Sequence, residues 1–191
     1  MSVQTKERIL KAAEKEFSQR GFYGTQISHI IQSAGVARGT FYLYFKSKEE
    51  VFQELLKRVV QDIRERIKPV DPTKDVISQV RQNIVSVVEY ALQNRDLARI
   101  VLFRSCEPEY AKITECFFEE LVELVKKTLE KGIEMGILKP IDTEIIARAI
   151  VGAGKEVLKG LISKEEVDLF KVAEELINFC MGGIWNDNRG A

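Results

Sequence analysis

Apolar residues along the whole chain recur at intervals of three and four, which is the spacing of one face of an α-helix. Ile9, Ala13 and Phe17 set this pattern near the start, and Phe117 and Leu121 continue it far along the chain. The sequence contains no convincing run of alternating β-branched residues, the pattern that predicts a strand. We therefore expect an all-α fold whose amphipathic helices bury their apolar faces against one another.

Glycine and proline residues divide this pattern into about nine helices. Gly21 and Gly35 separate three short helices, at about 5–19, 25–34 and 37–43, and Thr25 is expected to cap the second of them. Longer helices are expected at about 48–67, 76–94, 97–101, 109–131, 143–161 and 164–183. We expect the short helices to form a domain of residues 1–47 and the long helices a second domain of residues 48–191.

Composition narrows the functional classes. No apolar run approaches the ~20 residues of a membrane span, and the first residues lack the apolar region of a signal peptide. The three cysteines are too few and too scattered for a disulfide framework, which favours a reduced cytoplasmic setting. The single histidine, His29, is expected to be a solvated or capping residue. No zinc pattern or catalytic constellation is visible, so we expect neither a metal, a cofactor nor an enzyme.

Charge is distributed unevenly, although the chain as a whole is neutral. Residues 1–48 carry eight Lys or Arg against three acids, an excess of five positive charges that the remaining residues balance with an excess of five acids. A basic N-terminal part joined to an acidic remainder favours contact between the first part and a polyanion. Chance fluctuation is the alternative, because five charges are a modest excess.

The segment AGVARGTFYLYFKSKEE, Ala34 to Glu50, carries four aromatic residues within five positions. Two short helices joined by a glycine-containing turn, with another helix packed before them, form a helix-turn-helix unit. The second helix of such a pair enters the major groove of DNA. We expect Val36, Phe41 and Phe45 to form the small core that supports this helix.

The residues between these aromatic positions suit contacts with DNA. Arg38 can bind guanine in a bidentate manner, and Thr40 can donate a hydrogen bond to a base or pack its methyl group on thymine. Gly39 has no side chain, so the backbone can approach DNA closely there. The side chains expected to contact phosphate oxygens are Tyr42, Tyr44 and Lys48.

The spaced run T-x-I-x-x-I-x-x-x-A-G-V-x-x-G-T-x-Y-x-Y-F-x-S-K-E-E, from Thr25 to Glu50, resembles the DNA-binding domain of TetR-family transcriptional regulators. This resemblance implies a homodimer that binds operator DNA and releases it when a small ligand occupies the C-terminal domain. It assigns DNA contact to Thr25, Arg38, Gly39, Thr40, Tyr42, Tyr44 and Lys48. Two positions depart from the family pattern: Ala37 replaces the usual Ser or Thr cap, and Ile31 replaces a usual Ala.

The long helices are expected to hold the dimer interface and the ligand. Apolar stripes on the last two helices predict a four-helix interface, with a close crossing at the segment Gly152 to Gly154. The residues expected in this interface are Ile146, Ala149, Ile150, Ala153, Val157, Phe170, Ala173 and Ile177. The lining expected for a small, largely apolar ligand is Tyr90, Leu102, Phe103, Arg104, Phe117, Phe118 and Leu121.

The function predicted from these features is that of a sequence-specific DNA-binding transcriptional regulator, a ligand-released repressor of a palindromic operator. The alternative is a non-enzymatic helical interaction protein whose basic head binds another polyanion or a protein. That alternative leaves the grouping of Arg38, Gly39 and Thr40 with the aromatic residues unexplained.

Overall fold

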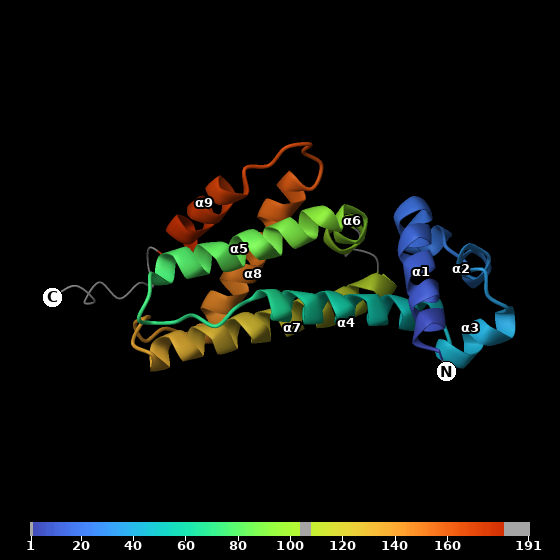
Figure 1. Cartoon of the computed structure of the whole chain (residues 1–191), viewed down its shortest axis with the longest axis horizontal. Helices are drawn as coiled ribbons and strands as arrows, with labels where there is room; N and C mark the ends of the chain where they lie inside the picture. The colour runs from blue at the N-terminus through green and yellow to red at the C-terminus, as the bar shows by residue number, and fades with distance from the viewer. Residues whose placement is uncertain (1, 104–107, 182–191) are drawn as a thin grey trace.

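The computed structural model describes residues 2–103 and 108–181, and within these ranges the chain folds into nine helices with no strand (Figure 1). The helices are α1 (Val3–Gly24), α2 (Ile27–Ala34), α3 (Arg38–Tyr44), α4 (Lys48–Arg66), α5 (Val76–Gln93), α6 (Arg95–Phe103), α7 (Pro108–Glu134), α8 (Thr143–Leu161) and α9 (Leu169–Met181). The all-α prediction is therefore confirmed. We call residues 2–47 the head and residues 48–181 the body.

Two glycines shape the head where the sequence predicts breaks. Gly21 has a φ of 70°, so the regular part of α1 ends there and a further turn runs to Gly24. Gly35 has a φ of 60° and ends α2, with its N–H bonded back to the carbonyls of Ile31 and Gln32. Both positions lie in the left-handed region, which glycine adopts without steric cost.

The predicted cap of α2 is wrong by one residue. Gln26 is the N-cap, and its backbone N–H donates to Nδ1 of His29 at 3.2 Å while its side chain accepts from the N–H of His29. The hydroxyl of Thr25 instead points back to α1 and donates to the carbonyls of Gly21 (2.6 Å) and Glu16 (3.0 Å). His29 is thus a capping residue, as its position on this helix predicts.

The core of the head is a cluster of buried phenylalanine rings. Phe17 and Phe22 of α1 lie with their ring centroids 5.3 Å apart, and Phe52 of α4 lies within 5.7 Å of both. Phe41 of α3 belongs to the same buried cluster. Full burial of each such ring contributes about 1.5–3 kcal/mol. Because Phe52 comes from α4, the first turns of that helix are part of the core of the head.

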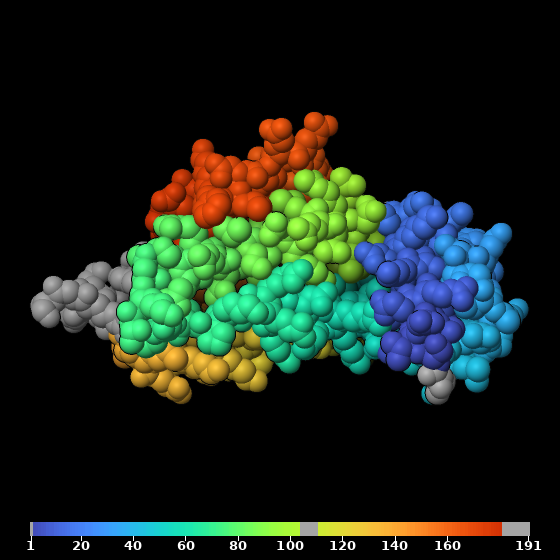
Figure 2. Space-filling model, in the orientation of Figure 1, coloured from blue at the N-terminus to red at the C-terminus, as the bar shows by residue number. Residues whose placement is uncertain are grey.

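The body is built from pairs of packed helices (Figures 1 and 2). α7 packs along α8, α5 packs along α9, and α6 lies against α1, so that α6 joins the body to the head. α4 leaves the head and runs into the body beside α7. A separate apolar cluster lies between α7, the turn after it and α8, and includes Val122, Leu138 and Ala147. On the face shown in Figure 2, the surface of the body is hollowed between α4 and α5.

The last helix begins later than its apolar pattern predicts. α9 starts at Leu169 rather than at Lys164, because the carboxylate of Asp168 accepts the N–H of Lys171 at 3.0 Å and so occupies the capping position. Asp142 caps the start of α8 in the same way, because its side chain accepts hydrogen bonds from the N–H groups of Glu144 and Ile145.

The part of the chain that the structure describes contains neither a membrane-spanning helix nor a cluster of metal-ligating side chains. None of its helices is long and apolar enough to cross a membrane. No group of three or more His, Cys, Asp or Glu side chains is placed to hold a metal ion among residues 2–103 and 108–181.

Candidate nucleic-acid and ligand sites

α3 presents one side to the core of the head and the other side to solvent. Phe41 and Phe45, four residues apart, are buried and their rings lie 6.1 Å apart. The opposite side exposes Arg38, Gly39 and Tyr42, with the Arg38 guanidinium 5.9 Å from the centroid of the Tyr42 ring. A short helix with such an exposed face has the geometry of a recognition helix.

The start of α3 is supported by contacts from α1 and lacks a side-chain cap of its own. Arg8 donates from Nη2 to the carbonyls of Ala34 (2.7 Å) and Gly35 (2.9 Å) and so fixes the turn that precedes α3. Ala37 occupies the N-cap position and makes no side-chain hydrogen bond, which agrees with the expected loss of a cap. At Gly39, an added Cβ would meet no atom within 4 Å, so packing within the head does not require glycine there.

Three of the expected DNA-contact residues donate hydrogen bonds from their side chains to backbone carbonyls of the protein itself. Thr25 is buried and its hydroxyl bonds to α1. Lys48 donates from Nζ to the carbonyls of Phe22 (2.8 Å) and Thr25 (3.2 Å). The hydroxyl of Tyr44 donates to the carbonyl of Ser2 at 3.1 Å. These contacts tie α1, α3 and α4 together, so the side chains hold the head in shape.

Two exposed residues near the recognition face were missed by sequence reasoning. Leu43 is 68% exposed on α3, and Lys46 is exposed just beyond it. An apolar side chain on this face can pack on the methyl group of thymine, and a lysine can approach a phosphate. The helical spacing of the buried Phe41 and Phe45 could have identified Leu43, because it places this intervening residue on the outer side.

The expected ligand-lining residues do not surround one cavity. Phe117 is 6% exposed and packs against Phe118, whose ring lies 4.3 Å below the ammonium of Lys155. Phe103 is 53% exposed and lines a different pocket, beside α1. Leu102 is buried, Leu121 packs against the core, and Arg104 lies outside the described residues.

Tyr90 is held by two charged neighbours from α4 rather than turned toward a cavity. Its hydroxyl donates to the carboxylate of Asp62 at 2.7 Å, and the guanidinium of Arg66 lies 4.5 Å from its ring centroid. Burial raises the pKa of Tyr90, and the hydrogen bond to Asp62 raises this pKa further. The Tyr90 side chain therefore joins α5 to α4.

An open groove of about 700 Å³ lies between α4 and α7. Its apolar lining comes from Leu56 and Val60 of α4 and from Ile113 and Phe117 of α7. The other lining residues are polar or carry sulfur, namely Glu49, Gln53, Lys57, Lys112, Cys116 and Glu120. The lining of the groove therefore combines four apolar side chains with two lysines and two glutamates.

The expected interface residues divide into three groups by their exposure in the single chain. Ala149 and Phe170 are exposed, and Phe170 is 66% exposed. Ile146, Ile150, Ala153 and Val157 of α8 are half-buried. Ala173 and Ile177 are buried where α9 packs on α5, so that part of the α9 stripe is used within the subunit.

In the described part of the subunit, no other helix crosses α8 closely at Gly152 or Gly154. A Cβ added at Gly152 or Gly154 would meet no atom within 4 Å. The neighbouring Ala149 and Ile145 are exposed on the same helix. This face of α8 is therefore uncovered in a single chain.

Comparison with known proteins assigns both parts of the chain. Residues 9–55 match the family model described as bacterial regulatory proteins of the tetR family. Residues 73–183 match the model of the tetracyclin repressor-like C-terminal domain. The second match spans more than half of the chain.

Similar proteins include transcriptional regulators of bacteria. The HTH-type transcriptional regulator YdgC of Bacillus subtilis is 29% identical over 192 residues, which cover 95% of this chain and 93% of that protein. The fatty acid metabolism regulator protein of Bacillus subtilis is 26% identical over 185 residues, covering 94% and 95%. A solved TetR-family transcriptional regulator from Syntrophomonas wolfei has a TM-score of 0.82 at 25% identity and covers 93% of both chains. The likeness thus extends over the head and the body together.

Proposed function

Because this chain belongs to the TetR family and is a DNA-binding transcriptional regulator, we propose that it represses transcription from a palindromic operator as a homodimer and releases the operator when a small ligand binds the body. The exposed face of α3 carries this proposal. Arg38, Gly39, Thr40 and Tyr42 supply the operator contacts, joined by Leu43 and Lys46. Thr25, Tyr44 and Lys48 act indirectly, by holding α3 against α1 and α4.

The homodimer forms through α8 and α9. The uncovered face of α8 at Ile145, Ala149 and Gly152, together with the exposed Phe170 of α9, supports this arrangement. Two heads related by a twofold axis read two half-sites of a palindrome. Operator binding therefore depends on the dimer, and the protein acts in the cytoplasm, where it meets DNA.

The ligand is a small, largely apolar molecule that binds in the α4–α7 groove. The apolar lining at Leu56, Val60 and Phe117 supports an apolar body for the ligand, and Lys57 and Lys112 can pair with an acidic group. A long-chain fatty acid or its coenzyme A thioester is the first candidate, because a relative of the chain is a fatty acid metabolism regulator and a structure of the regulator FadR from Bacillus subtilis, which has a similar fold, contains stearoyl-CoA. α4 begins in the core of the head, so a ligand that moves α4 moves the head.

Selection of DNA fragments by the purified chain tests this function. We expect enrichment of fragments with a palindrome whose half-sites lie about one helical turn apart. Adding palmitate or its coenzyme A thioester should weaken operator binding roughly 5- to 150-fold. Failure to enrich any sequence over random DNA would contradict the assignment of α3 as a recognition helix.

A single substitution tests the groove. Phe117→Trp should blunt the response to the acyl ligand, because the larger ring fills the groove, while operator affinity without ligand stays at the wild-type level. The matched control is Phe179→Trp, which changes the same side chain at an exposed position on α9. An unchanged response in Phe117→Trp would place the ligand elsewhere.

A further inference from the structure

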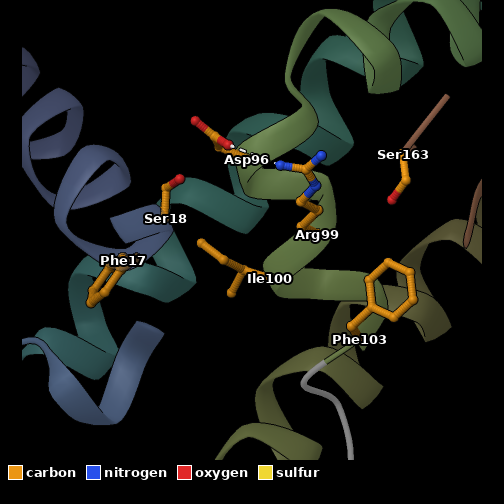
Figure 3. A pocket seen from close by; sticks show the side chains of 7 residues that line it. All are labelled: Phe17, Ser18, Asp96, Arg99, Ile100, Phe103 and Ser163. Atoms are coloured by element: carbon orange, nitrogen blue, oxygen red, sulfur yellow. Dashed lines mark ion pairs between the residues drawn. The ribbon is translucent and has the colours of Figure 1, made fainter. Parts of the chain in front are cut away.

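A second pocket lies where the head meets the body, between α1, α6 and the segment that follows α8 (Figure 3). Its volume is about 350 Å³, which is within the range of small-molecule sites. Phe17 and Ser18 come from α1, and Ser163 lies just after the end of α8. The other lining residues belong to α6 and are Asp96, Arg99, Ile100 and Phe103.

The apolar part of this pocket comes from both sides of the junction. Phe17 is part of the buried core of the head, and Ile100 of α6 packs into the same core. Phe103 lines the pocket with them and is more than half exposed. An apolar group in the pocket would cover part of the Phe103 ring and would touch head and body together.

The polar part of the pocket carries charges of both signs. The nearest nitrogen and oxygen atoms of Arg99 and Asp96 are 3.9 Å apart, and both side chains are more than half exposed. Such a long, exposed ion pair holds its partners weakly. A ligand with its own opposite charges can therefore take the place of this pair at little cost.

A further carboxylate, Glu14 of α1, lies near Asp96 but outside the residues that line the pocket. Glu14 precedes Ser18 by one turn of α1 and is half-buried. Its burial raises the pKa of Glu14, and the negative charge of Asp96 raises this pKa further. The carboxylates of Glu14 and Asp96 thus repel each other, and a positive group beside Asp96 would offset this repulsion.

This charge pattern selects among ligand classes. A simple carboxylate would meet the negative charges of Asp96 and Glu14, whereas a simple amine would meet the positive charge of Arg99. A zwitterion satisfies both ends, with an ammonium group beside Asp96 and a carboxylate beside Arg99. The hydroxyls of Ser18 and Ser163 add hydrogen-bonding groups to the wall.

We propose that this junction pocket binds an α-amino acid with a large apolar side chain, and that its occupancy is coupled to operator binding. The apolar side chain lies against Phe17, Ile100 and Phe103, and the charged groups meet Asp96 and Arg99. This site is distinct from the α4–α7 groove. The coupling, but not the binding, rests on the proposed function of the chain.

The coupling follows from the position of α6. Its first residue, Arg95, donates to the carbonyl of Ile162 at 2.6 Å and so ties α6 to the end of α8. Its buried residues Leu97 and Ile100 share the core that contains Phe17 of α1. A ligand that bridges α1, α6 and Ser163 fixes the position of the head relative to the body. In the dimer this position sets the separation of the two heads, which operator binding also fixes.

Calorimetric titration of the full-length protein without DNA tests the site. The probes are L-phenylalanine, phenylacetate, which lacks the ammonium group, and phenethylamine, which lacks the carboxylate. We expect L-phenylalanine to bind at least about tenfold more tightly than either analogue. Arg99→Gln and Asp96→Asn should each weaken its binding about tenfold or more, whereas Arg64→Gln, an exposed change on α4, should leave it unchanged.

Operator titrations with and without L-phenylalanine test the coupling. L-phenylalanine should change operator affinity by a factor of about 5 or more, and operator DNA should change the affinity for L-phenylalanine by the same factor. The site is refuted if neither L-phenylalanine nor L-leucine saturates the protein at millimolar concentration, or if Arg99→Gln binds as well as wild type. Loss of selective DNA binding in the ligand-free wild type would refute the proposed function while leaving the titrations without DNA valid.

Discussion

At the scale of single residues, Arg38 of the head and Lys48, the first residue of α4, have opposite tasks. The guanidinium of Arg38 lies on the exposed face of α3, over the ring of Tyr42. The ammonium of Lys48 is turned inward to the carbonyls of Phe22 and Thr25, and it lies 4.4 Å from the centroid of the Phe22 ring. The same positive charge therefore serves recognition in one residue and folding in the other.

Arg38→Ala should relax the sequence preference of the protein. Loss of a bidentate contact to guanine costs about 1–3 kcal/mol at one base pair of each half-site. Lys46→Ala is the matched comparison, because a lost phosphate contact should weaken all sequences alike and reduce the salt slope by about 1. Binding measured on operators mutated base by base separates the two effects. Equal losses on every sequence for Arg38→Ala would contradict its contact with a base.

Lys48→Met should destabilise the fold before it affects DNA. The substitution keeps an apolar stem against Phe22 but removes the charged hydrogen bonds to two carbonyls, a loss of about 1–3 kcal/mol for such bonds. Denaturation with urea measures the change in free energy of unfolding. Lys11→Met, an exposed change on α1, should be nearly neutral. If Lys48→Met unfolds like wild type, these hydrogen bonds contribute nothing measurable.

At the scale of helices, α8 has more apolar surface than its own subunit covers. The sequence of α8 is rich in apolar residues, but only Ala147 and Leu161 of this helix are buried. α5 is similar, with Val76 and Val88 buried and its other apolar residues partly open. For α8 the open face lies at Ile145, Ala149 and Gly152, which is where a second copy can pack.

Ala149→Arg should produce a folded monomer that no longer binds its operator. Ala149 is exposed in the single chain and arginine is a good helix former, so the fold should survive. In the dimer the charge would be buried without a partner, which is strongly unfavourable. Sedimentation at micromolar concentration measures the assembly, and Thr128→Arg, exposed on α7, is the control. A dimeric Ala149→Arg protein would exclude this face from the interface.

The positions of the helices could be predicted from the sequence, because the spacing of apolar residues and the glycines that end helices are local features of the chain. Gly21 and Gly35 could be identified as breaks from the sequence, and both have positive φ. The roles of Thr25 and Lys48 could not, since their partners lie 4 to 26 residues away and depend on how α1 meets α4. The burial of Ala173 within the subunit could not be predicted for a similar reason: an apolar stripe does not reveal whether α5 or a second chain covers it.

At the scale of the whole molecule, α1 is the element through which head and body meet. Glu7 of α1 accepts both of its hydrogen bonds from Arg58 of α4 at 2.7 Å, and this contact lowers the pKa of Glu7. About two turns further along α1, burial raises the pKa of Glu14, and the negative charge of Asp96 on α6 raises this pKa further. Glu7 is thus paired at the junction with α4, whereas the junction with α6 disfavours ionisation of Glu14.

Glu14→Gln should stabilise the protein at neutral pH. Because the folded-state pKa of Glu14 is raised, ionisation of Glu14 costs stability as pH increases through its titration, and the cost is absent below the ordinary pKa of the carboxyl. The melting temperature of the variant should exceed that of wild type by a few degrees at about pH 7 and should match it near pH 4. Glu89→Gln, an exposed change on α5, should show no such difference. A variant less stable than wild type at neutral pH would contradict this account.

The head lies at one end of the long axis of the molecule, with the body extending away from it (Figure 1). Residues 1–48 carry an excess of five positive charges and the rest of the chain an equal negative excess, so this geometry gives the protein a permanent electric dipole along that axis. The electric field of DNA exerts a torque on such a dipole. This torque turns the head toward the phosphates during diffusion and turns the acidic end away. Encounters should therefore be oriented before contact, and salt should slow association as it shortens the range of the torque.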